Sequence, residues 1–279
     1  AVHRDSESMN HEQERTLVVA LGASNLSRGL SRLLKASRCC SLSAVDLVVA
    51  AGHGRSYGAN SRIWKRSLPS ILESGLWRSL DRLLRSGVSK NSQRLAVITD
   101  IGNDLLYGFS TEQLAKWLEE VIHRLHQQQF NIVITKLPVE SIESVGPFRF
   151  RFLKTFFVPG CRQSLEEIKE QSRQVNDNIV YIAKKYQISV IEQPGSWYGL
   201  DAIHIRRSCL EDFWRRVVEC WSEYKCDTNT HQETSLRSTW QEWFRIGAAS
   251  AEVRSLAGVM LFTPQPVFQL GDTTRVFLY

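Results

Sequence analysis

The feature that most constrains this 279-residue sequence is a regular alternation of short apolar runs with longer amphipathic stretches. Near-continuous apolar runs of this length are typical of strands buried on both faces of a parallel sheet. The runs are residues 16–22, 45–51, 95–99, 132–135 and 188–191. Helical spacing of apolar residues is found in 26–36, 63–84, 111–127, 165–185 and 207–224. The alternation predicts an α/β fold in which helices cover both faces of a parallel sheet of about five strands.

The length suits one large domain with an appendage, because a single hydrophobic core seldom serves many more residues than this. Residues 1–15 form a polar N-terminal tail, and residues 16–226 hold the whole strand and helix alternation. Residues 227–279 follow a polar, linker-like stretch, and we interpret them as a C-terminal extension of unknown role.

Two segments do not fit the alternation. In the extension, residues 240–246 are predicted to form a short helix, and 258–262 and 267–279 are strand-like, the latter with a turn at Gly271-Asp272. Residues 146–162 carry five phenylalanines between a strand and a helix. This segment is a candidate lid or pocket wall, or else part of the core packed on the sheet.

Composition excludes several classes of protein. No apolar run approaches the roughly 18 residues of a membrane span, so we predict a soluble protein with no membrane span. The net charge is +6, but the basic residues form no long continuous block, which disfavours nucleic-acid binding. Six cysteines without a C-x-x-C pair disfavour a zinc ribbon or a thioredoxin-like motif. The polar residues 1–15 are no secretory signal, so we expect free thiols in a reducing cytoplasm; a signal removed before this numbering begins is also compatible with the sequence.

Chemically useful side chains follow four of the five predicted strands. Ser24 follows the first, Gly54 the second, Asn103 the third, and Asp201 and His204 the fifth. In open parallel sheets the ligand lies beyond the carboxyl ends of the strands, where these residues would meet. Together they supply a nucleophile, oxyanion donors, a general base and an acid that orients it. This set predicts acyl-transfer chemistry.

Each of these residues also has an ordinary structural explanation. Ser24 suits a helix N-cap, Asn103 a turn, and a glycine-rich loop a tight turn. The loop over residues 52–58 does not have the spacing of a dinucleotide-binding motif, and no Walker-type sequence occurs. We therefore expect no cofactor. His123 and His126 lie three apart on a predicted helix, but no acidic or cysteine partner is near in sequence, so we predict no metal site.

The ordered set of motifs resembles the SGNH (GDSL-type) hydrolase family over residues 17–224. The matching positions are Gly22-Ala23-Ser24 with Asn25 after it, Gly54 (or alternatively Gly58), Asn103-Asp104, Leu137-Pro138 and Asp201-Ala202-Ile203-His204. Two positions depart from the family pattern. Ala23 stands where aspartate is common, and Ile101 stands where glycine is usual.

The resemblance implies a flavodoxin-like, three-layer α/β/α sandwich and a serine esterase or acyl hydrolase. Ser24 would be the nucleophile, His204 the base and Asp201 its orienting acid, with an oxyanion hole from the Ser24 and Gly54 N–H groups and the Asn103 amide. We expect substrate contacts from a further set: Asn25, Pro138, Phe148 and Trp197. The substrate would be a small-molecule, saccharide or lipid ester.

A catalytically inactive binding or scaffold protein that keeps the fold is the main alternative. An α/β-hydrolase is disfavoured, because the chain has no G-x-S-x-G elbow and its candidate serine follows the first strand. The acyl chain length, the alcohol part of the substrate and the oligomeric state are not encoded in any recognisable motif.

Overall fold

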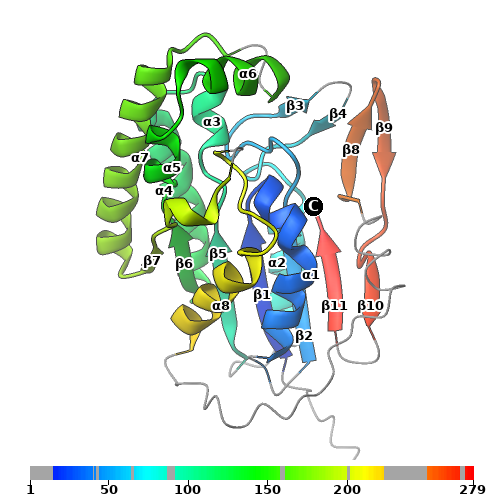
Figure 1. Ribbon diagram of the computed structural model, residues 1–279. Helices are drawn as coiled ribbons and strands as arrows, with labels where there is room; N and C mark the ends of the chain where they lie inside the picture. The colour runs from blue at the N-terminus through cyan, green and yellow to red at the C-terminus, as the bar shows by residue number, and fades with distance from the viewer. Residues whose placement is uncertain are drawn as a thin grey trace, which may run out of the picture.

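A seven-stranded sheet, in the order β10-β11-β2-β1-β5-β6-β7, forms the centre of the protein (Figure 1). The computed structural model describes residues 15–39, 41, 44–63, 66–86, 92–157, 161–199, 202–222, 250–270 and 274–279. The five predicted strands are all present and mutually parallel: β1 (Arg15–Leu21), β2 (Ala44–Ala50), β5 (Arg94–Ile98), β6 (Asn131–Thr135) and β7 (Ser189–Ile191). The apolar runs form these strands because both of their faces are covered.

Helices cover both faces of this sheet, so the predicted three-layer α/β/α sandwich is confirmed. On one face lie α1 (Ser24–Cys39) and α8 (Leu210–Trp221), which pack on Val18 and Ala20 of β1. On the other lie α2 (Leu76–Arg85), α4 (Thr111–Gln127) and α7 (Leu165–Tyr186), which pack on Leu17, Val19 and Leu21. Successive residues of one strand thus serve two separate cores. Shorter helices connect the layers: α3 (Asn103–Leu106), α5 (Val139–Glu143), α6 (Pro147–Phe157) and the 3₁₀ helix η1 (Gly195–Trp197).

The two additional strands of the central sheet come from the C-terminal part of the chain. β11 (Thr274–Leu278) pairs parallel to β2, and β10 (Phe268–Leu270) pairs antiparallel to β11. A buried ionic cluster fastens β11: Asp46 of β2 accepts paired hydrogen bonds of 2.6–2.9 Å from both Arg15 and Arg275. Burial alone would raise the pKa of Asp46, but hydrogen bonds from Arg275 and Arg15 and their charges lower it below its usual value.

A second, four-stranded antiparallel sheet has the order β3-β4-β8-β9. It joins β3 (Ser61–Ile63) and β4 (Arg66–Leu68) to β8 (Val253–Leu256) and β9 (Val259–Phe262). The predicted helix over 63–84 is therefore wrong in its first half, and α2 begins only at Leu76. β3 pairs with β4, and β4 pairs in turn with β8, nearly two hundred residues away, which local periodicity cannot reveal.

Some predicted elements lie outside the described residues: most of the N-terminal tail, the helix at 240–246 and the turn at Gly271-Asp272. Within the described part of the chain, none of the helices combines the length and the apolar character needed to cross a bilayer.

Candidate active site

Ser24 and His204, 180 residues apart in sequence, meet at the carboxyl end of the central sheet. Ser24 is the first residue of α1, directly after β1, and is only 9% exposed. His204 lies in the loop before α8. The distance from Ser24 Oγ to His204 Nε2 is 2.9 Å, which is hydrogen-bonding distance. A serine hydroxyl bonded to an imidazole nitrogen can lose its proton to that nitrogen as it attacks an electrophile.

The turn that carries Ser24 is held by a carboxylate that we did not predict, that of Asp100. Asp100 Oδ2 accepts hydrogen bonds from the backbone N–H groups of Ala23 (2.9 Å) and Leu26 (3.0 Å). A carboxylate at a helix N-terminus satisfies unpaired N–H groups and complements the positive end of the helix dipole. Thus, although Ala23 stands where the family has aspartate, a carboxylate reaches this turn from the end of β5. The sequence offered one hint of this role, because Asp100 follows a predicted strand and directly precedes the Ile101-Gly102-Asn103 segment, which we assigned to the site.

Asn25 couples this turn to the loop that carries His204. Its Nδ2 donates to Asp100 Oδ1 (2.8 Å) and to the Ile203 carbonyl (3.0 Å), while its Oδ1 accepts from the N–H of Ile205 (2.9 Å). Both amide hydrogens are therefore used, and the residue is buried. The predicted substrate contact of Asn25 stays a prediction; its hydrogen bonds show that it also fixes the backbone on both sides of His204.

The loop after β2 places Gly54 in the left-handed region, with φ of +65°. The hydroxyl of Tyr107 donates a hydrogen bond to the Gly54 carbonyl. The next residue, Arg55, is completely buried and donates to the carbonyls of Ala51 (3.2 Å), Pro69 (3.2 Å) and Tyr279. Burial lowers the pKa of Arg55 to about 9, so the guanidinium remains charged at neutral pH. A buried cation thus fixes the backbone next to Gly54.

A second buried charge, Asp104 of α3, holds the far side of the same loop. It accepts hydrogen bonds from the Ser56 hydroxyl and from the N–H of Tyr57 (3.2 Å). Burial raises the pKa of Asp104 to about 6. The Tyr57 hydroxyl in turn donates to the Thr99 carbonyl (2.6 Å), at the end of β5. The loop is therefore fixed to the central sheet.

Asn103 and the two candidate glycines complete the predicted site. The Asn103 side-chain amide lies 3.4 Å from the Arg55 carbonyl, and Asn103 lines the same cavity as Ser24. Gly58 has a packing reason to be glycine, since an added Cβ would lie 1.9 Å from the ring of Trp117. Gly54 directly precedes Arg55, the residue whose carbonyl the Asn103 amide contacts.

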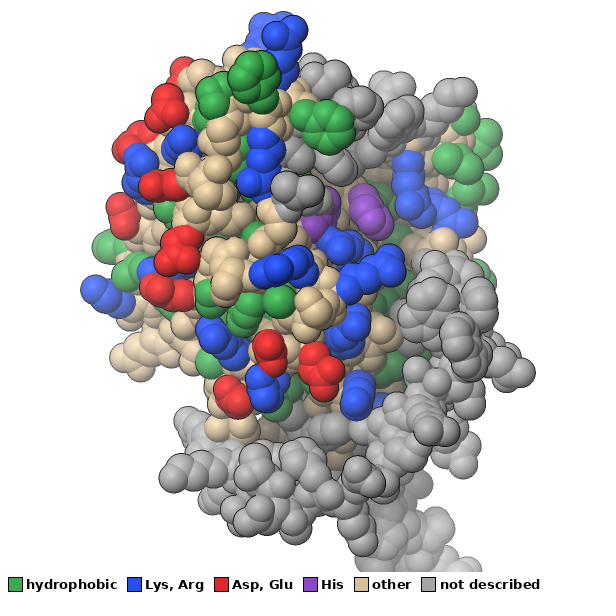
Figure 2. Space-filling view, viewed as in Figure 1, with side chains coloured by type: hydrophobic (Ala, Val, Ile, Leu, Met, Phe, Trp, Pro, Cys, Tyr) green, Lys and Arg blue, Asp and Glu red, His purple; other side chains and the backbone are tan. Residues whose placement is uncertain are grey.

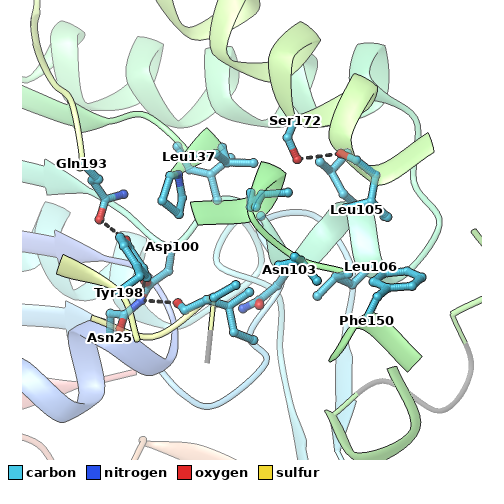
Figure 3. Close-up of a pocket in the computed structure, with 18 of the residues that line it drawn as sticks. Asn25, Asp100, Asn103, Leu105, Leu106, Leu137, Phe150, Ser172, Gln193 and Tyr198 are labelled. Atoms are coloured by element: carbon cyan, nitrogen blue, oxygen red, sulfur yellow. Dashed lines mark hydrogen bonds between the residues drawn. The ribbon is translucent and has the colours of Figure 1, made fainter. Parts of the chain in front are cut away.

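The cavity at Ser24 is mainly apolar and extends between α3, α5, α6 and α7 (Figure 3). It encloses about 1060 Å³ of empty space, counting the solvent at its mouth. The side chains deeper in the cavity share an apolar character: Leu105, Leu106, Leu137, Ile142, Val145, Phe150, Cys161, Leu165 and Ile168. Polar groups line the part nearer the reactive pair, among them Asn103, Gln193 and Tyr198, whose hydroxyl donates to Gln193 Oε1 (2.6 Å).

Of the predicted substrate contacts, the structure brings Pro138 and Asn25 to the cavity wall but not Phe148 or Trp197. Phe148 is 93% exposed. Phe150, two residues on, lines the cavity instead, because residues two apart lie on opposite sides of a helix. Trp197 is buried in the core with its ring 6.0 Å from that of Phe213. Asp201, the predicted orienting acid, lies outside the described residues.

A second histidine, His53, lies close enough to His204 for the two to interact electrostatically. The pKa of the neighbouring histidine, His53, is lowered by burial and by the nearby charges of His204, Arg66 and Arg28. Histidine side chains on this face lie among lysines and arginines (Figure 2). Elsewhere, His123 and His126 each pack edge-on against Tyr186, with ring centroids 6.4 and 5.4 Å away.

No family model and no curated protein matches this sequence. Solved structures with a similar chain path exist. They include the psychrotrophic esterase EstA from Pseudoalteromonas sp. (14% identity over 73% of this chain and 97% of that one, TM-score 0.44). An aryl esterase from M. smegmatis is 10% identical, over 73% of this chain and 97% of its own (TM-score 0.47). AlinE4, an SGNH-hydrolase family esterase, is 16% identical, over 64% of this chain and 76% of its own (TM-score 0.37). At these values we base the function on the chemistry of the site alone.

Proposed function

We propose that this protein is a serine esterase of the SGNH type, which cleaves a carboxylic ester through an acyl-enzyme on Ser24. The observation that carries the proposal is the 2.9 Å contact between Ser24 Oγ and His204 Nε2, beside a mainly apolar cavity that Ser24 lines. His204 would take the proton of Ser24 as the hydroxyl attacks the ester carbonyl. Asp201 is proposed, from its position in the sequence, as the acid that orients His204.

The negative charge that develops on the carbonyl oxygen needs hydrogen-bond donors in place before the reaction. The N–H groups of Ser24 and Gly54 and the side-chain amide of Asn103 are the proposed donors. Asn103 has a second amide hydrogen besides the one directed at the Arg55 carbonyl. His204 then returns its proton to the leaving alcohol, and a water activated by the same imidazole releases the acid from Ser24.

The apolar depth of the cavity supports an acyl chain as the part of the substrate that is bound there. Its wall consists mainly of apolar side chains, which offer an acyl chain dispersion contacts and exclusion from water. We therefore expect p-nitrophenyl esters of medium-length acids to have a higher kcat/KM than p-nitrophenyl acetate. Narrowing the cavity with Ile142→Trp should reverse this preference.

The direct test is the variant Ser24→Ala, with Ser27→Ala on the same helix as its matched control. Ser27 donates its hydroxyl to the Ala23 carbonyl and takes no proposed part in the reaction. We expect Ser24→Ala to lower kcat/KM by about 10⁴-fold or more while Ser27→Ala changes it little. A fluorophosphonate probe should label Ser24 in the parent protein and in the control. Intact turnover in Ser24→Ala would refute the proposal, and absence of both labelling and turnover in the parent protein would favour a non-catalytic binding protein.

A further inference from the structure

The exposed apolar side chains of this protein gather on the segments around the cavity mouth. Seven large apolar side chains are exposed among the described residues, and six of them lie on α6 or on the β8–β9 hairpin. On α6 these are Phe148 (93% exposed) and Phe152 (57%). The hairpin carries the other four: Leu256, Val259, Met260 and Phe262, which are 51–72% exposed. Exposed apolar side chains that cluster in this way mark an interaction surface.

Of these two segments, α6 borders the cavity directly. It contributes Phe150 and Lys154 to the cavity wall, so its opposite face, with Phe148 and Phe152, points away from the cavity. The β8–β9 hairpin pairs with β4, and the β3–β4 ribbon continues from the loop that contains Gly54. Figure 1 shows α6, β3–β4 and β8–β9 at the end of the molecule to which β1 and β11 point. We call residues 61–63, 66–68, 147–157 and 253–262 the rim.

The charged residues of the rim are all basic. Among the residues whose side chains are described, the rim contains five basic residues and no acidic one: Arg66, Arg149, Arg151, Lys154 and Arg254. In Figure 2 apolar side chains stand out at the top over α6 and at the upper right over β8–β9, while acidic side chains gather over α7 and lower on the molecule. Alternation of phenylalanine with arginine on a short helix suits the boundary between lipid headgroups and acyl chains, where apolar rings insert and cations meet phosphates.

We propose that the rim docks this protein on an anionic lipid surface, with the mouth of the Ser24 cavity against the lipid. A second copy of the chain fits this surface less well, because a twofold contact would place one basic rim on another. A lipid surface instead supplies negative charge to the arginines and an apolar layer to the phenylalanines. The proposal concerns binding, so it holds or fails separately from the esterase activity.

The test measures binding of the full-length Ser24→Ala variant to vesicles by co-sedimentation, so that no lipid is hydrolysed. Vesicles of phosphatidylcholine containing roughly one-third phosphatidylglycerol should bind the protein at least about tenfold more tightly than phosphatidylcholine alone, and added salt should remove most of the difference. The double changes Phe148→Ser with Phe152→Ser, and Val259→Ser with Phe262→Ser, should each weaken binding about tenfold or more.

Tyr181→Ser is the matched control, since Tyr181 is also an exposed aromatic residue (70%). It lies outside the rim, near the C-terminal end of α7, which leads into the start of β7. It should bind vesicles as the parent does. Equal urea midpoints for all variants show that the fold is kept. Unchanged vesicle binding in either double variant overturns the proposal. The proposal is also overturned if the parent does not bind vesicles and instead forms a dimer, detected by light scattering, that the double variants do not form.

Discussion

The turn that carries Ser24 and the loop that carries Gly54 follow neighbouring strands, β1 and β2, but are held in opposite ways. At the Ser24 turn, the carboxylate of Asp100 accepts hydrogen bonds from backbone N–H groups. At the Gly54 loop, the guanidinium of Arg55 donates hydrogen bonds to backbone carbonyls. The first depends on a residue at the end of the adjacent strand β5. The second depends on Tyr279, which follows β11.

This difference shows that the C-terminal strands are part of the candidate active site's support. β11 adds an edge to the sheet beside β2, and Tyr279 then reaches both Arg55 and, through its hydroxyl, Ser79 of α2 (2.5 Å). Within the part of the chain that the structure describes, the Ser24 turn makes no hydrogen bond to the C-terminal strands. We therefore expect substitutions at the Gly54 loop and at the Ser24 turn to change the free energy of unfolding and the turnover by different amounts.

The largest effect is expected from Arg55→Met. It removes the donor for three buried carbonyls and leaves acceptors without partners, at a cost of about 1–3 kcal/mol each before any relaxation. We expect the free energy of unfolding to fall by about 3 kcal/mol, and kcat/KM to fall about 100-fold because Gly54 is displaced. Urea unfolding and ester turnover measure the two effects. Arg215→Met, at an exposed position on α8, is the control; a loss below about 1 kcal/mol at Arg55 would show that the loop does not depend on this cation.

The next effect concerns pH and Asp104. Because its folded pKa of about 6 lies above the reference value of 3.8, the folded protein holds a proton that the unfolded chain releases between these pH values. This group's contribution to the free energy of unfolding is therefore full below about pH 4 and is lost as pH rises through 6. Asp104→Asn does not titrate. From pH 4 to pH 7, parent stability should fall relative to the variant by about 2–3 kcal/mol. Parallel profiles of unfolding free energy against pH for the two proteins would contradict the raised pKa of Asp104.

Asp100→Ala tests the Ser24 turn. It removes the acceptor for Ala23 and Leu26 at the helix N-terminus, which should lower the free energy of unfolding by about 1–2 kcal/mol. Since Asn25 also loses a partner, we expect His204 to be less well placed, with kcat reduced about tenfold and KM nearly unchanged. Asp212→Ala, in the first turn of α8, provides the control. Unaltered kcat in Asp100→Ala would mean that this carboxylate only stabilises the helix.

Tyr107→Phe should have the smallest effect. Burial and the charge of Asp104 raise the pKa of Tyr107 to about 12, so its hydroxyl is a donor at any working pH. Removing the bond to the Gly54 carbonyl should cost about 1 kcal/mol in unfolding free energy and lower kcat a few-fold. Tyr181→Phe, an exposed tyrosine, serves as the reference. If Tyr107→Phe weakens turnover as much as Arg55→Met, the Gly54 loop is held mainly by Tyr107, at the end of α3, and not by Arg55 and Tyr279.

Much of the central fold could be predicted because its signals are local. The five parallel strands are apolar runs, and the helix 111–127 was predicted with the bounds that α4 has. α7 begins at a capping box in which Ser164 and Glu167 bond each other's backbone. In contrast, residues 63–84 were predicted as helical, since nothing near β4 in the sequence indicates its pairing with β8.

The candidate site divides in the same way. Ser24, Asn103 and His204 could be named from the sequence because each follows a strand of a parallel sheet, and such ends converge on one edge. Phe148 was a mistaken choice over Phe150, since a phenylalanine-rich segment does not show which face of its helix turns inward. Asp100 and Arg55 were not assigned, because their roles depend on which distant backbone groups they meet.

The sequence by itself determined the alternation of strands and helices and the candidate site residues, Ser24 and His204, at the sheet's carboxyl edge. Only the tertiary structure decided that Asp100 holds the Ser24 turn, that Asn25 holds the His204 loop, and that Arg55 joins the Gly54 loop to Tyr279. The physical reason is that hydrophobic periodicity is a property of neighbouring residues. The partner of a buried polar group is instead fixed by long-range packing, which brings together backbone groups from distant parts of the chain.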